Sequence, residues 1–537
     1  MKAIKIFLLS AILLNSIGCT ELADESYSIL IAKDFEVTES EVGSIIASAY
    51  VPWNDLFGGW GSYFWAQDVS SDALVIPKRP WGWVDAGDYR RLHEHKWTAD
   101  DLVIVQCWRR AYRGITTTNR VIYQIENDLV PLGEFKENAL AELKVLRATY
   151  YYVLLDMYGN IPIVTNFDVP EGFLPEQSSR KEVFDFLVND ITENIDLLNE
   201  ETGSASYGRI NKWVAHTLLA KLYLNAEVYT GEAMWDKCIE QCDIVIESNK
   251  YALESNQKNN FIVYNEGSGE IIWSLVFDEN YTAGWNVFDH HMQTLPQEAQ
   301  ATYSLRFSPW GGICAIPQFI DTFNPLDERY TENWLKGQLY DRNGNKLTVQ
   351  NGSLKDKDLV LINDLPAVDT SQAVHGLRLS KFEVEQGAGV IPNNDYTFFR
   401  YADILMMKAE SLLRTGSTGE AAAIVTQIRE RSFRNNPAEA PVTGAELMGG
   451  SRYDYGRRDV HVTTQEGGND VLYGRFMDEL GYEFFEECRR RQDMIRFGVF
   501  TTKSWFSHEP NGDYRSLYPI PQEEINKNSN LKQNPGY

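Results

Sequence analysis

The chain has 537 residues, of which 43% are hydrophobic and 12% aromatic, so it can bury a large core. Its formal net charge of −26 repels nucleic-acid phosphates and anionic lipid surfaces. Nucleic-acid binding and a basic membrane-binding patch are therefore disfavoured. The composition shows no low-complexity tract of the kind that keeps a chain disordered.

Residues 1–18 are predicted to form a lipoprotein signal peptide. Two lysines precede an apolar stretch at 6–14 that is too short to span a bilayer, and Gly18-Cys19 follows. Small residues before a cysteine resemble the bacterial lipobox, although Ser16 stands where leucine is usual. An ordinary secretory peptide with an incidental cysteine is the alternative. Acidic residues after Cys19 resemble the surface-export signal of Bacteroidetes lipoproteins. We expect a lipidated Cys19 and a surface-exposed, outer-membrane protein that is held by this anchor alone.

The N-terminal half, from about 36 to 250, is predicted to be helical, because apolar residues recur at three- and four-residue spacings. The successive helices are joined by short turns, and we expect them to stack in pairs like tetratricopeptide repeats, although the strict repeat consensus is absent. The predicted helices span 101–126, 135–158, 181–198, 212–229 and 233–248.

Residues 251–395 are rich in glycine, asparagine and proline and are predicted to be loop-rich, with a strand at 270–277. Helices resume in a C-terminal part, 396–537, at 398–415, 419–431 and 471–497. The sequence therefore predicts a mainly α fold, organised as one domain over 19–537 whose N-terminal half, about 36–250, is helical. Loops held between helical parts are suited to display a binding site.

No sequence pattern for catalysis or metal binding is present: HExxH, P-loop and GxSxG are all absent. The close pairs His93/His95 and His290/His291 lack further ligands at metal-binding spacing. An odd number of later cysteines without CxxC pairs argues against a disulfide framework. We therefore expect no cofactor, no metal and no enzymatic activity.

Four segments in chain order together resemble the hallmarks of the SusD/RagB family of outer-membrane nutrient-binding lipoproteins. They are LRATYYY at 146–152 with YGNIP at 158–162, FRYADIL at 399–405 with KAE at 408–410, the charged series at 479–496, and YPIPQEE at 518–524 with NLKQNPGY at 530–537. The resemblance implies a SusD-like fold, in which helix pairs scaffold a loop-built site.

The charged series is predicted to be structural. Its members, Glu479, Glu483, Glu487, Arg490, Asp493 and Arg496, have spacings that place them along one face of a helix, where intrahelical ion pairs can form. Asp327 and Arg329 match a family-wide pattern and are expected to be structural too. The proline-rich C-terminus is suited to pin an extended tail onto the body.

Tryptophans are concentrated in irregular segments, where they could serve as stacking platforms for sugar rings. Trp108 and Trp213 lie in periodic helices and are assigned to the core. For any single one of the other tryptophans, a place in the core is the alternative to a role as a platform. The family resemblance implies a site built from an early loop near 72–83 and from the middle loops. The candidate glycan-binding residues are accordingly Trp81, Trp83, Trp285, Trp310, Asn286, Asp72 and Arg79.

The resemblance further implies a cell-surface lipoprotein that binds poly- or oligosaccharide and delivers it to a SusC-like TonB-dependent transporter. Two alternatives remain open: a RagB-like lid for peptide or other non-glycan cargo, and a helical-fold glycoside hydrolase, for which no residue pattern gives positive support.

Overall fold

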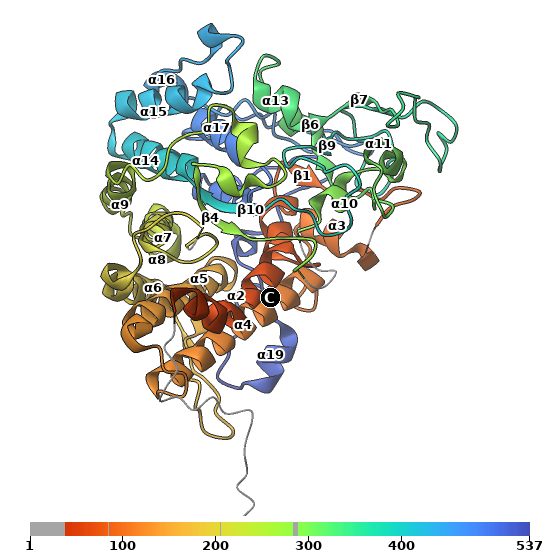
Figure 1. Ribbon diagram of the computed structural model, residues 1–537. Helices are drawn as coiled ribbons and strands as arrows, with labels where there is room; N and C mark the ends of the chain where they lie inside the picture. Colours follow the sequence, from red (N-terminus) through yellow and green to blue (C-terminus); the bar gives the residue numbers. More distant parts are fainter. Residues whose placement is uncertain (1–37, 84, 205, 283–287) are drawn as a thin grey trace, which may run out of the picture.

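The computed structural model describes residues 38–83, 85–204, 206–282 and 288–537 (Figure 1). Helices are the main regular structure and the strands are short, so the predicted mainly α fold is confirmed. Cys19, Trp285 and Asn286 lie outside the described residues. What we expect of those three residues stays a prediction.

The N-terminal helices form a stack that occupies the lower part of Figure 1. Helix α2 (Glu39–Gly58) packs on α4 (Leu102–Glu126), α4 packs on α5 (Lys136–Tyr158), and α5 packs on α6 (Arg180–Asn194). Helix α5 is buried between its neighbours, since Tyr150, Tyr151 and Tyr152 are all buried.

Helices α4 and α5 approach closely at a glycine. A Cβ atom at Gly114 would lie 2.2 Å from the Tyr150 ring, so a larger residue at this position would push the helices apart. The Tyr150 hydroxyl crosses to donate a hydrogen bond of 2.7 Å to the carbonyl of Ala49 in α2. One aromatic side chain thus joins three helices.

The stack continues with helices from the middle and the C-terminal part of the chain. Helix α7 (Lys212–Leu224) packs on α9 (Trp235–Glu247), α9 packs on α14 (Tyr401–Thr415), and α14 packs on α15 (Thr418–Glu430). Segments that are far apart in sequence therefore form one helical layer, along the left side of Figure 1.

Two predicted helices are interrupted or shortened. The predicted helix 212–229 breaks at Asn225, before α8 (Ala226–Thr230), and the Asn225 side chain accepts a hydrogen bond of 3.0 Å from Arg496. The helix predicted from residue 398 begins only at Tyr401, because β10 (Tyr396–Arg400) pairs antiparallel with β4 (Ile271–Leu275). Both strands are buried on both faces, so their sequences lack the apolar–polar alternation that would distinguish a strand from a helix.

The other strands form two-residue pairs, of which β1 with β5 joins the loop-rich middle to the N-terminal part of the chain. They pair antiparallel as β1 (Leu74–Val75) with β5 (Cys314–Ala315), β2 (Ile161–Pro162) with β3 (Gln177–Ser178), β6 (Trp334–Leu335) with β9 (Arg378–Leu379), and β7 (Gly337–Gln338) with β8 (Val360–Leu361).

The prediction of one continuous helix at 471–497 is wrong, because the structure has two helices there. Helix α17 (Gly474–Phe484) and helix α18 (Arg490–Arg496) are separated by a turn in which Glu486 and Cys488 have φ values of 68° and 57°. The side chain of Asp68 accepts hydrogen bonds from both of their backbone N–H groups, at 3.2 and 2.9 Å.

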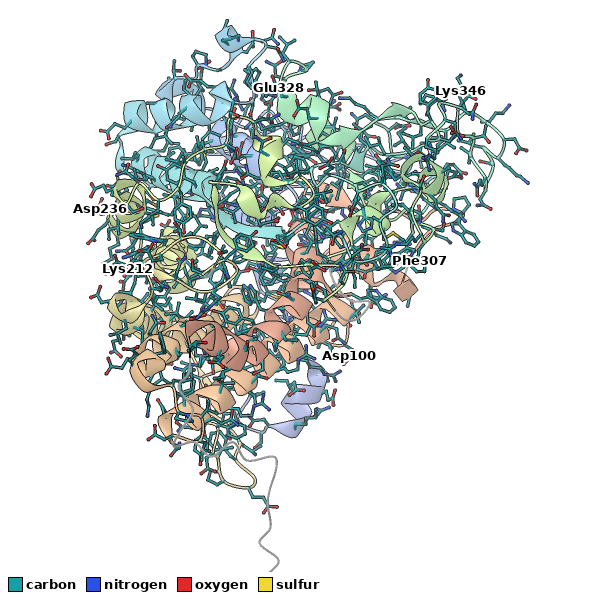
Figure 2. The ribbon with its side chains drawn as sticks, viewed as in Figure 1. Asp100, Lys212, Asp236, Phe307, Glu328 and Lys346 are labelled. Atoms are coloured by element: carbon teal, nitrogen blue, oxygen red, sulfur yellow. The ribbon has the colours of Figure 1, made fainter. Side chains whose placement is uncertain are left out.

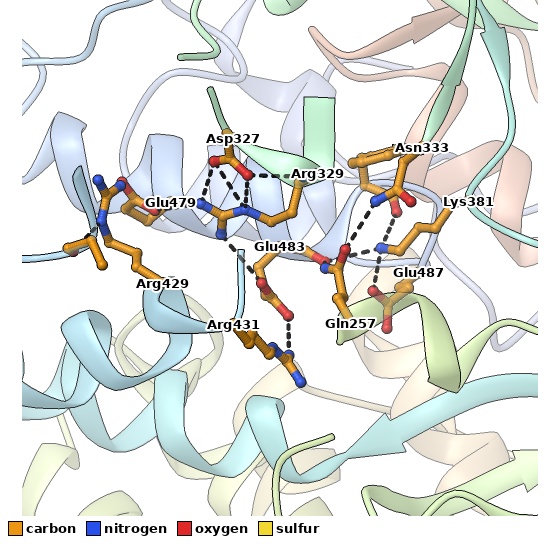
Figure 3. Close-up of polar contacts among 12 residues, drawn as sticks. Gln257, Asp327, Arg329, Asn333, Lys381, Arg429, Arg431, Glu479, Glu483 and Glu487 are labelled. Carbon is orange, nitrogen blue, oxygen red and sulfur yellow. Dashed lines mark hydrogen bonds and ion pairs between the residues drawn. The ribbon is translucent and has the colours of Figure 1, made fainter. Parts of the chain in front are cut away.

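Because the helix is broken, most residues of the charged series form ion pairs with residues of other elements (Figure 3). Glu483 accepts from Arg329, Arg400 and Arg431 at 3.2, 2.8 and 2.5 Å, and all four side chains are nearly inaccessible to solvent. Burial opposes ionisation of Glu483, but the three guanidinium groups outweigh it and hold its pKa well below the usual value.

Within α18 the predicted intrahelical pairing is confirmed for one pair. Asp493 and Arg496 lie three residues apart and form an ion pair of 2.7 Å. Asp327 and Arg329 are structural as expected: they pair with each other at 2.7 Å, and Arg329 also reaches Glu479. The charged series is thus a buried inter-element network as well as a helix face.

The C-terminal tail is pinned to the body as predicted. The Asn534 amide donates to the carbonyls of Tyr158 and Tyr518 at 2.9 and 2.8 Å. The Trp97 indole donates to the Tyr537 hydroxyl at 2.7 Å, which in turn donates to the Leu517 carbonyl.

Charged side chains such as Asp100, Asp236 and Lys346 lie at the periphery of the molecule (Figure 2). In the described ranges, the cysteines are buried and free. Helices long and apolar enough to cross a membrane do not occur among the residues that the structure describes.

Candidate binding site

A pocket of about 700 Å³ opens among the loops next to the β1–β5 pair. We call it the tryptophan pocket and define it by its lining residues, which are Trp60, Pro80, Trp81, Gly82, Trp83, Asp289, Gln293 and Trp310. Three of the tryptophans predicted as platforms, Trp81, Trp83 and Trp310, therefore lie together, although more than 200 residues separate Trp310 from the other two in sequence.

The β1–β5 ladder brings these tryptophans together. Val75 lies opposite Cys314 in antiparallel register, so the segment after β1 and the segment before β5 leave the ladder at the same end. Trp81 and Trp83 are on the first segment and Trp310 is on the second. The backbone N–H of Trp310 donates to the Met292 carbonyl at 2.7 Å, which attaches the second segment to α10 (His290–Thr294).

The indole rings are inclined to one another and form a concave wall. The Trp83 ring centroid lies 5.6 Å from that of Trp310, with an interplanar angle of 64°. It lies 6.5 Å from that of Trp60, with an angle of 45°. Trp60 and Trp81 are 47% and 59% exposed, so their faces are open to a ligand, whereas Trp83 and Trp310 are half-buried.

A second aromatic layer supports Trp83 from behind. Trp65 and Tyr89 stack on each other with centroids 4.3 Å apart, and the Trp83 centroid lies 4.9 Å from each of them. Both supporting rings are completely buried. Because buried aromatic clusters leave little room for rotamer change, Trp83 is held in place before any ligand arrives.

Arg79 is buried behind the pocket and fixes its backbone. Its guanidinium donates to the carbonyls of Gly311 and Gly312 at 3.0 and 2.7 Å, and to the carbonyl of His375 at 2.9 Å. Gly311 and Gly312 directly follow Trp310. Arg79 is not among the residues that line the tryptophan pocket, and its contacts position the loop rather than the ligand.

The polar residues of the pocket come from α10 and the residue before it. Asp289 and Gln293 are 3% and 2% exposed, and the Gln293 amide donates a short hydrogen bond to Asp289. Burial raises the pKa of Asp289 well above the usual aspartate value. The pocket therefore offers aromatic faces and a polar floor.

Asp72 lies in the interior and does not line the pocket. Its carboxylate accepts two hydrogen bonds from Arg490, at 2.7 and 2.9 Å, and one from the Tyr455 hydroxyl at 2.9 Å. Asp72 has no exposed surface and both of its carboxylate oxygens accept hydrogen bonds, so it is a structural ion-pair residue. We leave both Asp72 and Arg79 out of the proposed ligand contacts.

A second hollow, a groove of about 500 Å³, lies between α4, the loop at 162–175 and the C-terminal tail. Its aromatic residues include Phe167 and Phe173, which are 40% and 46% exposed. Trp108 and Tyr112 also line it, but Trp108 is buried and Tyr112 is half-buried, so the groove exposes no indole face. The tryptophan pocket is the better candidate for a ligand with flat, weakly polar faces.

The histidine pairs are structural. His93 and His95 are completely buried and bond to the carbonyls of Phe506 and Ser70 at 2.6 and 2.8 Å. Burial lowers the pKa of His93 to about 4 and that of His95 to about 3. Over the described ranges, no three His, Cys, Asp or Glu residues are arranged to hold a metal ion.

Sequence reasoning missed Trp60, Asp289 and Gln293 as pocket residues. Trp60 was recognisable as a tryptophan in an irregular segment, but so were Trp53 and Trp65, which are buried in the core. Asp289 and Gln293 carry no pattern that singles them out, since their importance depends on the position of α10 beside Trp310.

A stack of helix pairs that carries a solvent-open aromatic pocket in its loops defines a helical ligand-binding protein. The chain belongs to the SusD family: the SusD family model matches residues 269–537. A second model, described as starch-binding associating with outer membrane, matches residues 79–224.

Relatives match over most of their length. The starch-binding protein SusD of Bacteroides thetaiotaomicron is 26% identical, covering 89% of this chain and 86% of its own. SusD-like protein P25 of Formosa agariphila is 23% identical, covering 98% of this chain and 97% of its own.

Solved structures share the fold. A SusD superfamily protein from Parabacteroides distasonis has a TM-score of 0.71 at 18% identity, over 94% of this chain and 100% of that one. A laminarin-binding SusD-like protein has a TM-score of 0.69 at 20% identity, with the same coverage. Surface glycan-binding protein A from Bacteroides thetaiotaomicron, in complex with laminarihexaose, has a TM-score of 0.68 at 18% identity, over 93% of this chain and 100% of that one.

Proposed function

We propose that this chain is a cell-surface lipoprotein that captures a neutral poly- or oligosaccharide in the tryptophan pocket. The observation that carries the proposal is the convergence of Trp60, Trp81, Trp83 and Trp310 on one open pocket. A pyranose ring has an apolar C–H face and a rim of hydroxyl groups, so it stacks on an indole while polar side chains bind its rim.

The charge of the molecule narrows the class of glycan. A net charge of −26 disfavours sulfated and uronic polysaccharides, and the described polar floor of the pocket, Asp289 and Gln293, carries no positive charge to attract them. The names of the relatives support a neutral glucan, since SusD of Bacteroides thetaiotaomicron is a starch-binding protein and one structural neighbour binds laminarin.

The pocket is proposed to bind without turnover. A few stacking contacts with rim hydrogen bonds, less the cost of ordering the ligand, give roughly −4 to −8 kcal/mol, hence a Kd from about millimolar to micromolar. Weak, reversible capture suits a protein that passes its ligand on. We propose that Cys19 carries the lipid anchor and that the recipient is a TonB-dependent transporter.

The test is calorimetric titration of the protein lacking residues 1–19 against laminarihexaose, maltohexaose, a sulfated oligosaccharide and a mixed peptide pool. Saturable binding of a neutral hexaose, with the sugar recovered intact, supports the proposal. Binding of peptide alone would favour peptide cargo, and release of shorter sugars would favour a glycosidase. Gentle detergent extraction of the full chain should co-purify a TonB-dependent barrel at about equal stoichiometry, as expected for a dedicated partner.

A further inference from the structure

An apolar surface lies open along the groove of about 500 Å³ between α4, the loop at 162–175 and the C-terminal tail, which we call the α4 groove. Phe167, Val169 and Phe173 line it from the loop and are 40%, 39% and 46% exposed. Exposed apolar clusters on folded domains often mark a place where another segment binds. The cluster therefore indicates a docking surface for an apolar segment.

The rim of the same groove is basic, although the chain as a whole is strongly acidic. Arg109 and Arg113 line the groove one helical turn apart, and their side chains are 47% and 53% exposed. Their ion-pair partners, Glu523 and Asp55, lie on neighbouring elements. Because exposed ion pairs add little stability, both guanidinium groups can also bind other carboxylates. An occupant of the groove should therefore carry acidic as well as apolar side chains.

Residues 20–37 of this chain have both properties. This N-terminal segment lies outside the described residues and connects Cys19 to α2 in the sequence. It has five carboxylates and one lysine, Lys33, so its side chains carry a net charge of −4. Its apolar residues are densest at 29–32, where the sequence is Ile-Leu-Ile-Ala. The segment therefore matches the groove in charge and in apolar character.

The direction of α2 brings the start of this helix toward one end of the groove. Asp55 of α2 pairs with Arg113 of α4. Farther along α2, a Cβ atom at Gly59 would lie 2.8 Å from Arg110, which is earlier in α4. The two helices are therefore antiparallel, and α2 begins toward the C-terminal end of α4.

Residues 20–37 are long enough to return along α4 from that point. The Tyr123 ring, in the last turn of α4, packs on Phe167 of the groove loop with centroids 5.9 Å apart. A chain of 18 residues spans at most about 60 Å when extended. The part of α4 that lines the groove, from Trp108 to Asn119, is only about 17 Å long.

We propose that residues 20–37 dock in the α4 groove of their own chain, with apolar side chains against the loop at 162–175 and carboxylates beside Arg109 and Arg113. The pocket elements α10 and β1 lie above α4 and α19 (Gln522–Lys527) in Figure 1. A docked segment holds Cys19 near the lower face, so the anchored protein presents the tryptophan pocket away from its attachment point. This consequence rests on the proposed lipidation of Cys19, whereas docking itself depends on neither the lipid nor the glycan.

Trypsin provides a direct test, because Lys33 is the only lysine or arginine in residues 20–37. The protein lacking residues 1–19 is digested beside a synthetic peptide of residues 20–37, and mass spectrometry follows cleavage after Lys33. When docking and release are fast, the cleavage rate follows the undocked population. The segment in the protein should be cleaved about tenfold more slowly than the free peptide, at every protein concentration.

Variants of the groove should reduce this protection. Phe173→Ser removes part of the apolar wall and should speed cleavage about fivefold, and Arg109→Glu reverses a charge on the rim and should speed it about threefold. Leu326→Ser and Arg90→Glu are the matched controls, since both side chains are outside the groove and are as exposed as those of Phe173 and Arg109. Both controls should be cleaved as slowly as the wild-type protein.

Photo-cross-linking gives a second measurement that needs no groove variant. With p-benzoylphenylalanine in place of Tyr27, cross-links should map to 108–119 or 162–175 of the same chain. Equal cleavage rates for the wild-type protein and the free peptide, or for the wild-type protein and both groove variants, would overturn the proposal. Protection that rises with protein concentration, or cross-links between two chains, would overturn it in favour of a second copy as the occupant. Cross-links to another part of the same chain would exclude the groove as the docking site.

Discussion

Replacing Trp81 and Trp83 by alanine, one at a time, separates ligand contact from structural support within one pocket. Trp81 is 59% exposed, on a turn. Trp83 is half-buried, and its ring lies within 6.5 Å of four other aromatic rings, measured between centroids. Both residues line the pocket, so both variants should bind glycan less tightly, but only one should unfold more easily.

The magnitudes follow from these contacts. Truncating a fully buried tryptophan to alanine costs about 3–5 kcal/mol, and each aromatic pair contributes about 0.5–1.5 kcal/mol beyond its buried area. For the half-buried Trp83 we expect a loss of about 2 kcal/mol in unfolding free energy. Trp81→Ala should change stability by less than about 0.5 kcal/mol, because surface substitutions usually do. Each variant should lose about 1–2 kcal/mol in binding, or roughly five- to thirtyfold in Kd.

Denaturant unfolding and calorimetric titration against the best-binding hexaose, done on both variants, check these values. Trp108→Ala is the matched control, since it removes a buried tryptophan outside the tryptophan pocket: it should lose stability and keep the wild-type Kd. A Trp81→Ala variant with wild-type affinity and reduced stability would refute the assignment of this ring as a ligand platform.

Three further predictions concern the scaffold and the anchor. His95, whose pKa is lowered to about 3 by burial, stays neutral in the folded protein while the unfolded chain takes up a proton near pH 6.5. The free energy of unfolding should thus fall as the pH falls below 6.5. Between pH 6.5 and 4.5, the His95→Gln variant should lose about 2–3 kcal/mol less of this free energy than the wild-type protein, measured by urea unfolding at each pH. Parallel pH dependences of the two proteins would contradict this. Arg329→Met should lower the free energy of unfolding by about 3–5 kcal/mol, because it removes a cation from buried carboxylates. Arg90→Met, at an exposed ion pair, should lower it by under about 1 kcal/mol in the same assay. Equal costs would refute the role of burial. Cys19→Ala should abolish labelling with a palmitate analogue and release the protein from the membrane fraction, and persistent labelling would show another attachment site.

The helical stack could be predicted from the sequence because its information is local. Periodic apolar residues, a glycine after α5 at Gly159 and the capping box of Ser179 with Glu182 define helix bounds within a few residues. The errors occur where tertiary contacts override local pattern. Residues 398–400 read as helix but pair with β4, and the charged helix breaks where Asp68 binds the backbone of Glu486 and Cys488.

The binding site could be predicted only in part. Composition and loop context indicate tryptophans such as Trp81 and Trp310, but they do not distinguish an open platform from a core residue such as Trp53. Polar residues are harder still. Asp72 is a buried polar residue near the site, and only its partner Arg490 identifies it as part of the scaffold.

The buried charge network explains how a loop-built pocket can be rigid. Buried ion pairs add little net stability, because the cost of desolvation offsets their attraction, but they fix the relative positions of the elements that supply the charges. Arg490 extends α18 to Asp72, two residues before β1, and β1 leads directly to the segment with Arg79, Trp81 and Trp83. A chain of direct contacts therefore connects the scaffold to the indole platforms. Because that scaffold does not depend on the ligand, changes at rim residues such as Trp60 can alter glycan preference without disturbing the fold.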